Sequence, residues 1–155
     1  MKRVFFILGI LVYSLKLHAQ QSNDEYKTMI DSAIKIKYAQ LQDASKRLNN
    51  KYYFEKLYLL NEQDRALNYL NSSNKFKLID VYDAQNRKTI SKGIYAWKIL
   101  TVLNKNQFKV SIMDFYITYR NHNYNFSNSG GSEAIFKYNC NKEVWELVGF
   151  KTSGI

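Results

Sequence analysis

The sequence predicts an α+β domain in which one long N-terminal helix packs on a curved antiparallel sheet of four to five strands. Apolar residues recur at helical spacing over residues 23–48, and two later pairs of segments alternate apolar and polar residues around short polar turns. The chain after residue 19 is long enough for one hydrophobic core and too short for two ordinary domains. We therefore expect residues 1–19 to be a leader and residues 20–155 to form a single domain.

The leader has the three-part pattern of a secretory signal peptide. Lys2 and Arg3 supply positive charge, residues 4–15 are mostly apolar, and Ala19 ends the segment with a small side chain. The apolar run is shorter than the roughly 20 residues that span a bilayer. We therefore expect cleavage after Ala19 and an exported mature chain, periplasmic or secreted, with no transmembrane segment.

The helix is predicted over residues 23–48. Ser22 and Asn23 are favourable caps, and Asn49-Asn50 ends the periodic pattern. The apolar stripe recurs every three to four residues and consists of Ile30, Ile34, Leu41, Ala44 and Leu48. Opposite this stripe we expect a solvated face with the basic residues Lys35, Lys37, Lys46 and Arg47.

The segments after the helix are less regular. Residues 52–60 are rich in aromatic side chains, which favours a strand, but their leucines also fit a second helix, so both interpretations stay open. Residues 64–70 predict a short helical turn and residues 71–74 a loop. We expect a strand over residues 76–82 and a polar turn over residues 83–88.

Two hairpins are predicted in the second half. In the first, residues 94–103 and 108–119 flank a turn centred on Lys105-Asn106, which pairs Leu103 with Phe108 and Trp97 with Asp114. This register makes one face almost wholly apolar, whereas a slip by one residue would not. In the second, residues 133–140 and 143–150 flank Asn141-Lys142 and pair Tyr138 with Trp145 and Lys137 with Glu146. Between the hairpins, we expect residues 120–132 to form a long irregular segment.

This order of elements resembles the cystatin-like and nuclear-transport-factor-like domains, in which a curved meander wraps an N-terminal helix. The resemblance covers most of the chain after the leader and rests on element order. It implies the fold and the setting of a small exported bacterial protein. It assigns no site residue.

Composition excludes several classes of function. Removing residues 1–19 takes three of the 23 basic residues and none of the 13 acidic ones, so the net charge falls from +10 to about +7. Cys140 is the single cysteine, which excludes an internal disulfide. A lone thiol can pair between chains or act as a nucleophile, but more often it is a small buried apolar residue. His122 is the one histidine after the leader, so we expect no metal site. No cofactor-binding motif or nucleic-acid-binding motif is present, and we expect neither partner.

Asp114 is the most unusual residue of the predicted sheet, because it lies mid-strand on the apolar face. A carboxylate there needs a partner, since burying it alone costs several kcal/mol. A structural role predicts a hydrogen bond from Trp97 or a tyrosine, or an ion pair with a lysine or arginine. In domains of the resembled type such an aspartate can be a general base, and Tyr95 and Tyr116 are the candidate donors here.

The preferred contact residues are Arg120, His122, Tyr124 and Phe126, which combine charge with aromatic rings, together with Trp97. The alternative for Tyr124 and Phe126 is that they cover the open end of the sheet. We interpret the chain as an exported soluble binding module rather than an enzyme, with an envelope or extracellular protein or a small ligand as its partner. An inhibitor or immunity-type protein is a specific version. A small cavity enzyme and a structural or accessory envelope protein are the alternatives, and the oligomeric state stays open.

Overall fold

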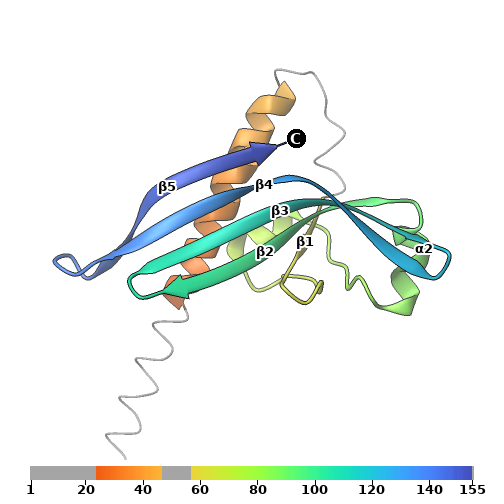
Figure 1. Cartoon of the computed structure of the whole chain (residues 1–155), viewed down its shortest axis with the longest axis horizontal. Coiled ribbons are helices and arrows are strands. Elements are labelled where there is room, and N and C mark those ends of the chain that lie inside the picture. The colour runs from red at the N-terminus through yellow and green to blue at the C-terminus, as the bar shows by residue number, and fades with distance from the viewer. Residues whose placement is uncertain (1–23, 47–56, 155) are drawn as a thin grey trace, which may run out of the picture.

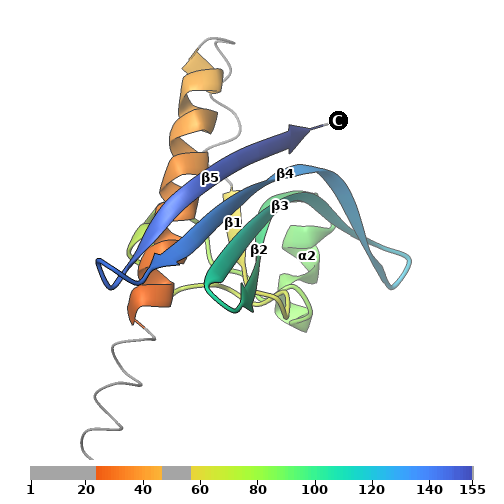
Figure 2. The same cartoon turned by 60° about the vertical axis from the view of Figure 1, so that its left-hand side comes forward.

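The computed structural model describes residues 24–46 and 57–154, and it confirms the α+β layout (Figure 1). A long helix over residues 24–46 packs on a sheet whose strands lie side by side in chain order. The strands are β1 (Leu57–Leu60), β2 (Ile94–Asn104), β3 (Gln107–Arg120), β4 (Asn123–Asn139) and β5 (Val144–Gly154). Figure 2 shows that β2 to β5 bend, so that the sheet is curved as predicted.

The helix agrees with its predicted position over all of its described residues. Met29, Ile30, Ala33 and Ile34 are buried against the sheet, as expected for an apolar stripe with a period of 3.6 residues. The predicted ends of the helix, residue 23 and residues 47–48, lie outside the described residues.

Both predicted hairpin registers are confirmed. Leu103 pairs with Phe108 and Trp97 pairs with Asp114 across β2 and β3. In β4 and β5 the predicted pairs hold as far as Phe136, after which a bulge shifts the register by one residue. Each register places apolar side chains on the buried face, which is the physical reason that pattern alone could define it.

The prediction of an irregular segment over residues 120–132 is wrong, because β4 begins at Asn123 and runs through these residues. Asn121 and His122 form a two-residue turn with φ of +50° and +61°, the backbone conformation of a tight type I′ hairpin. After the turn, Tyr124 and Phe126 alternate with polar residues, so this part of β4 buries one face only.

Residues 57–60 form a strand, whereas residues 52–56 lie outside the described residues. β1 runs parallel to β2, so the expectation of a wholly antiparallel sheet is wrong for this pair. A parallel pair needs a long crossover connection, which residues 61–93 provide. All of β1 is buried because both of its faces are covered.

Several predictions for the crossover, residues 61–93, are wrong. Residues 64–70 are not helical, and the predicted loop contains a 3₁₀ helix, η1 (Asn71–Lys75). Residues 76–82 are not a strand, because their buried side chains point into the core and only Lys77 bridges to Tyr58. The predicted polar turn holds a 3₁₀ turn, η2 (Ala84–Asn86), followed by the short helix α2 (Arg87–Ile90).

The sheet buries both of its faces, but against different elements. One face, which we call the helix-side face, packs on the long helix through Trp97, Ile99, Phe108, Val110 and Ile112. The opposite face packs on the crossover through residues such as Ile94, Ala96 and Ile117, which alternate with the first set along the same strands. Figures 1 and 2 show that the long helix and α2 lie beside different parts of the curved sheet.

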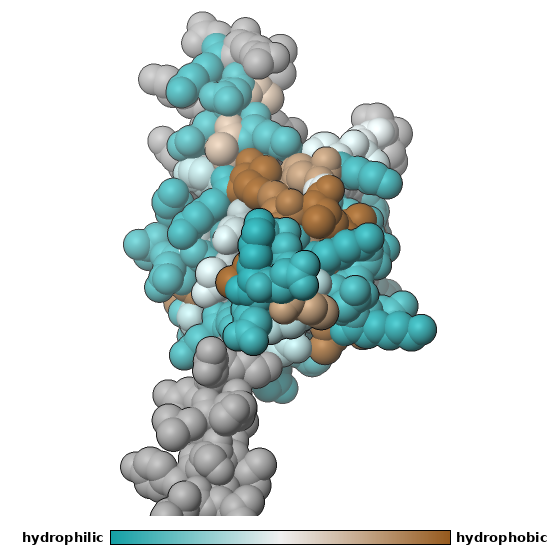
Figure 3. Space-filling view, turned by 90° about the vertical axis from the view of Figure 1, so that its left-hand side faces the viewer, coloured by the Kyte–Doolittle hydropathy of each residue, from teal (hydrophilic) through white to brown (hydrophobic). Residues whose placement is uncertain are grey.

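The surface carries both hydrophobic and hydrophilic residues. Figure 3 shows a hydrophobic patch surrounded by hydrophilic residues on one end of the molecule. Val144, Leu147 and Val148 of β5 are among the exposed large apolar residues.

Cys140, expected to be buried, is instead exposed in the β4–β5 turn. Among the described helices, none is long and apolar enough to span a membrane.

Candidate functional site

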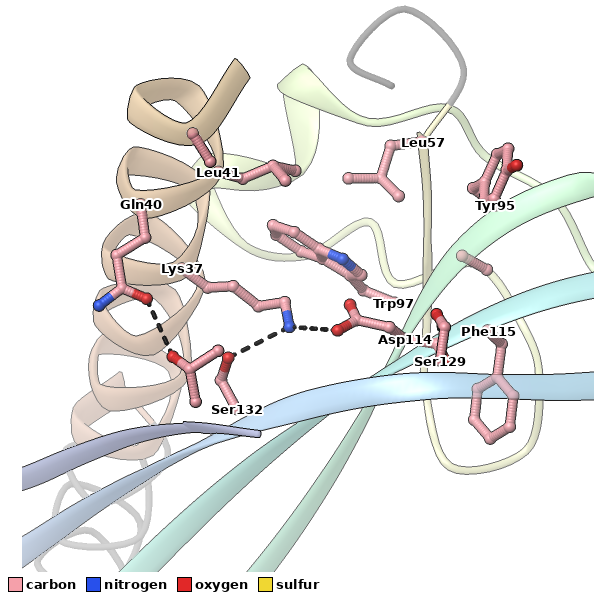
Figure 4. Close-up of a pocket in the computed structure, with 13 residues that line it drawn as sticks. Lys37, Gln40, Leu41, Leu57, Tyr95, Trp97, Asp114, Phe115, Ser129 and Ser132 are labelled. Carbon is pink, nitrogen blue, oxygen red and sulfur yellow. Dashed lines mark hydrogen bonds and ion pairs between the residues drawn. The ribbon is translucent and has the colours of Figure 1, made fainter. Parts of the chain in front are cut away.

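A cavity of about 320 Å³ lies between the long helix and the helix-side face of the sheet (Figure 4). Two layers of the fold meet there, because the helix and all five strands of the sheet contribute lining residues. The apolar walls come from Leu41 and Ala44 of the helix, Leu57 of β1 and Trp97 of β2. These side chains make a largely apolar space within a small domain.

Lys37 places its ammonium group in this cavity. Its Nζ atom lies 2.8 Å from Asp114 Oδ2, 3.1 Å from Ser132 Oγ and 5.1 Å from the centre of the Trp97 ring. Only 8% of the Lys37 side chain is exposed, against 28% for Asp114. Figure 4 shows the lysine reaching from the helix across to the strands. The ion pair therefore ties the helix to β3, while the hydrogen bond to Ser132 ties it to β4.

Burial lowers the pKa of the Lys37 ammonium below its usual value, because desolvation disfavours the charged form. The hydrogen bond to Asp114 and the charge of that carboxylate act in the opposite direction. Lys37 thus depends on Asp114 as its counter-charge in an apolar setting.

A bulge in β4 shapes the cavity beside Asp114. Asp114 pairs with Gly130 and Phe115 pairs with Asn128, so Ser129 is the extra residue of β4. Gly130 has a φ of +126°, and its N–H donates to Asn128 Oδ1 at 2.7 Å. Bulges redirect side chains at functional sites, and here Ser129 lines the cavity.

A second polar contact joins the helix to the far strand. Thr152 Oγ1 donates to Gln40 Oε1 at 3.1 Å, and both residues line the cavity. The contact connects β5 to the helix one turn beyond Lys37 (Figure 4). Polar links from the helix to β3, β4 and β5 therefore bound one part of the cavity, and apolar side chains of the helix, β1 and β2 bound the rest.

Three of the residues singled out in the sequence meet at this cavity: Tyr95, Trp97 and Asp114. Tyr116 is not among its lining residues. Its ring packs against Tyr95 at a tilt of 47°, with centroids 4.9 Å apart, and its hydroxyl lies against Gly93. Figure 4 shows the Tyr95 hydroxyl pointing away from Asp114. The two tyrosine hydroxyls do not converge on the carboxylate.

The other candidate contact residues lie elsewhere on the sheet. Arg120 and His122 are exposed at the β3–β4 turn. Tyr124 and Phe126 are partly buried against the core of the opposite face, where Phe126 meets Phe115 edge to face with centroids 5.8 Å apart. The structure therefore separates these four residues from Trp97.

Sequence reasoning missed the role of Lys37 by assigning it to a solvated face. Its position held a signal, because it lies three residues after Ile34 and four before Leu41, within the apolar stripe itself. A lysine inside a stripe that is otherwise apolar indicates a buried partner. Asp114, which needed a partner on the same grounds, is that residue.

The groups in the cavity define what it can do chemically. They are one cation, one carboxylate, a few hydroxyl and amide groups, and apolar walls. Across residues 24–46 and 57–154, no three His, Cys, Asp or Glu side chains are placed to hold a metal ion. The arrangement suits a molecule bound through apolar contacts and hydrogen bonds.

Comparisons with known proteins add little to this description. No protein-family model matches the chain, and no curated protein matches it. Among solved structures, it is similar to an NTF2-like protein with a cystatin-like fold from Novosphingobium aromaticivorans, with 8% identity and a TM-score of 0.32. The match covers 92% of this chain and 88% of the other. A likeness this weak assigns no role to any residue of the cavity.

Proposed function

We propose that the protein is a binding module that holds a small, mainly apolar molecule in the cavity between the long helix and the sheet. The observation that carries this proposal is the apolar space of about 320 Å³ beside the buried Lys37–Asp114 pair. Ligand pockets typically measure roughly 300–1,000 Å³ and combine apolar walls with a few placed polar groups.

Filling the cavity from the helix tests the proposal. Ala44 is an exposed helix residue that lines the cavity, and Ala39 is an exposed residue of the same helix that does not. We expect Ala44→Trp to weaken binding of the neutral fluorescent probe prodan about tenfold or more, since about 1.4 kcal/mol of lost contact suffices for that factor. Ala39→Trp should leave the affinity unchanged. Absence of prodan binding to the unmodified protein, or equal binding by both variants, would contradict the proposed function.

The alternatives from the sequence have less geometric support. A general base at Asp114 would act with Tyr95 or Tyr116, but those hydroxyls point elsewhere and the carboxylate is engaged by Lys37. An inhibitor or immunity-type role would use an external surface, and nothing within the described residues favours it over the cavity.

We further propose that the protein acts outside the cytoplasm. The support is the charged, apolar and small-residue pattern of residues 1–19. Expression of the full chain in a bacterial host with a general secretion pathway should give a product whose intact mass matches residues 20–155. Recovery of the uncleaved chain from the cytoplasm alone would contradict export.

A further inference from the structure

Two of the three N–H donors of Lys37 are occupied by hydrogen bonds. An ammonium group has three N–H bonds, and this one donates to Asp114 and Ser132 while the cation lies over the Trp97 ring. With 8% of the side chain exposed and its charge balanced by Asp114, Lys37 offers an anionic ligand little access and no net charge. The cavity is therefore not arranged to receive an anion.

One oxygen of the Asp114 carboxylate is available to accept a hydrogen bond from a ligand. Its Oδ2 atom accepts from Lys37, whereas within the described part of the chain no hydrogen bond reaches Oδ1. Figure 4 shows this second oxygen on the side of the carboxylate that faces Trp97. Because the side chain lines the cavity and is 28% exposed, a donor on a bound molecule can reach it. An ionised carboxylate accepts hydrogen bonds and donates none.

The charges of the cavity cancel. Lys37 and Asp114 are the two charged residues among those that line it, and they form one ion pair. A ligand with a net charge would bring an uncompensated charge among apolar side chains, which is unfavourable. An uncharged ligand avoids that penalty.

We infer that the ligand is an uncharged, mainly apolar molecule carrying a hydroxyl group that donates to Asp114 Oδ1. This inference rests on the proposed function and names the class of molecule that the same site takes. The apolar body lies against Leu41, Leu57 and Trp97, and the hydroxyl reaches the carboxylate. Aromatic and aliphatic alcohols have this chemistry, whereas carboxylates and ammonium ions do not.

Four probes of similar shape separate the possibilities: naphthalene, 2-naphthol, 2-naphthoate and 2-naphthylmethylammonium. The chain has two tryptophans, so Trp145→Phe leaves Trp97 as the single indole beside the cavity. Titration is followed by the NMR shift of the Trp97 indole N–H. We expect 2-naphthol to bind about tenfold more tightly than each of the other three probes, the effect of one hydrogen bond to a charged acceptor.

The double variant Lys37→Met/Asp114→Leu should still bind naphthalene and should lose the preference for 2-naphthol. The matched control is Lys109→Met/Glu133→Leu, which removes an ion pair of 3.1 Å on the opposite face and should retain the preference. Equal or tighter binding of either charged probe, or a preference that survives in the first double variant, overturns the inference while leaving the cavity a binding site. If naphthalene and 2-naphthol both fail to bind, the proposed function itself is wrong, and the inference falls with it.

Discussion

Replacing Lys37 with methionine is expected to lower the free energy of unfolding by about 3 kcal/mol, the lower end of the range for breaking a buried ion pair from one side. The change leaves Asp114 without its counter-charge in an apolar cavity, and it removes the hydrogen bond to Ser132. The partial exposure of Asp114 is the reason for choosing the lower value. Denaturant unfolding followed by circular dichroism measures the loss.

The double variant Lys37→Met/Asp114→Leu should return to within about 1 kcal/mol of the unmodified protein, because apolar side chains of similar size often replace a buried pair without loss. Lys46→Met is the control on the same helix, since 79% of the Lys46 side chain is exposed and its pair with Asp43 spans 4.0 Å. It should change stability by less than about 0.5 kcal/mol. A double variant as unstable as Lys37→Met would show that the pair is not the source of the effect.

Gly130→Ala is expected to lower the free energy of unfolding about as much as Lys37→Met does. The loss of about 3 kcal/mol comes from backbone strain and overpacking together. Gly130 has a φ of +126°, where side chains other than hydrogen are strained. A Cβ atom there would also lie 2.5 Å from Ser153 O and 2.9 Å from Gly154 Cα, both backbone atoms of β5. The bulge beside Asp114 would have to rearrange.

Gly149→Ala provides the matched comparison within the same pair of strands. A Cβ atom at Gly149 meets nothing within 4 Å, so the melting temperature should be almost unchanged. Prodan affinity should fall in Gly130→Ala, because Ser129 and Asp114 lose their positions, and should persist in Gly149→Ala. Equal melting temperatures for the two variants would contradict a structural requirement for glycine in the bulge.

The two hairpin registers could be predicted because each buries apolar side chains on one face. Leu103 opposite Phe108 and Tyr138 opposite Trp145 follow from alternation and from short polar turns. The same reasoning found the unusual position of Asp114, with Trp97 opposite. It did not name Lys37, although position 37 falls in the apolar stripe of the helix.

The start of β4 was missed because its composition suggested a loop. The run Ser-Asn-Ser-Gly-Gly-Ser is polar and small, yet it holds the bulge at Ser129 and the close approach of Gly130 and Gly131 to neighbouring strands. Small residues are needed there for space between strands, and composition alone does not distinguish that need from chain flexibility.

The structure of the crossover, residues 61–93, could not be predicted from local sequence patterns, for a different reason. The buried residues Ile79 and Val81 are fixed by contact with the opposite face of the sheet, and Phe76 by contact with Trp97 on the helix-side face, not by pairing with a neighbouring strand. The parallel pairing of β1 likewise depends on where residues 61–93 lead the chain. Such choices are made by tertiary contacts, which single-segment propensities do not contain.

Connectivity also sets the order of events when the chain folds. Strands β2 to β5 are joined by turns of two to four residues, so their contacts are local and their loop closure is rapid. Lys37 and Asp114 are 77 positions apart, and β1 reaches its partner strand through the whole crossover. We therefore expect the meander to assemble first and the helix to dock later. The chain then gains the space between helix and sheet only in the closing step of folding, after most of its hydrogen-bonded ladder has formed.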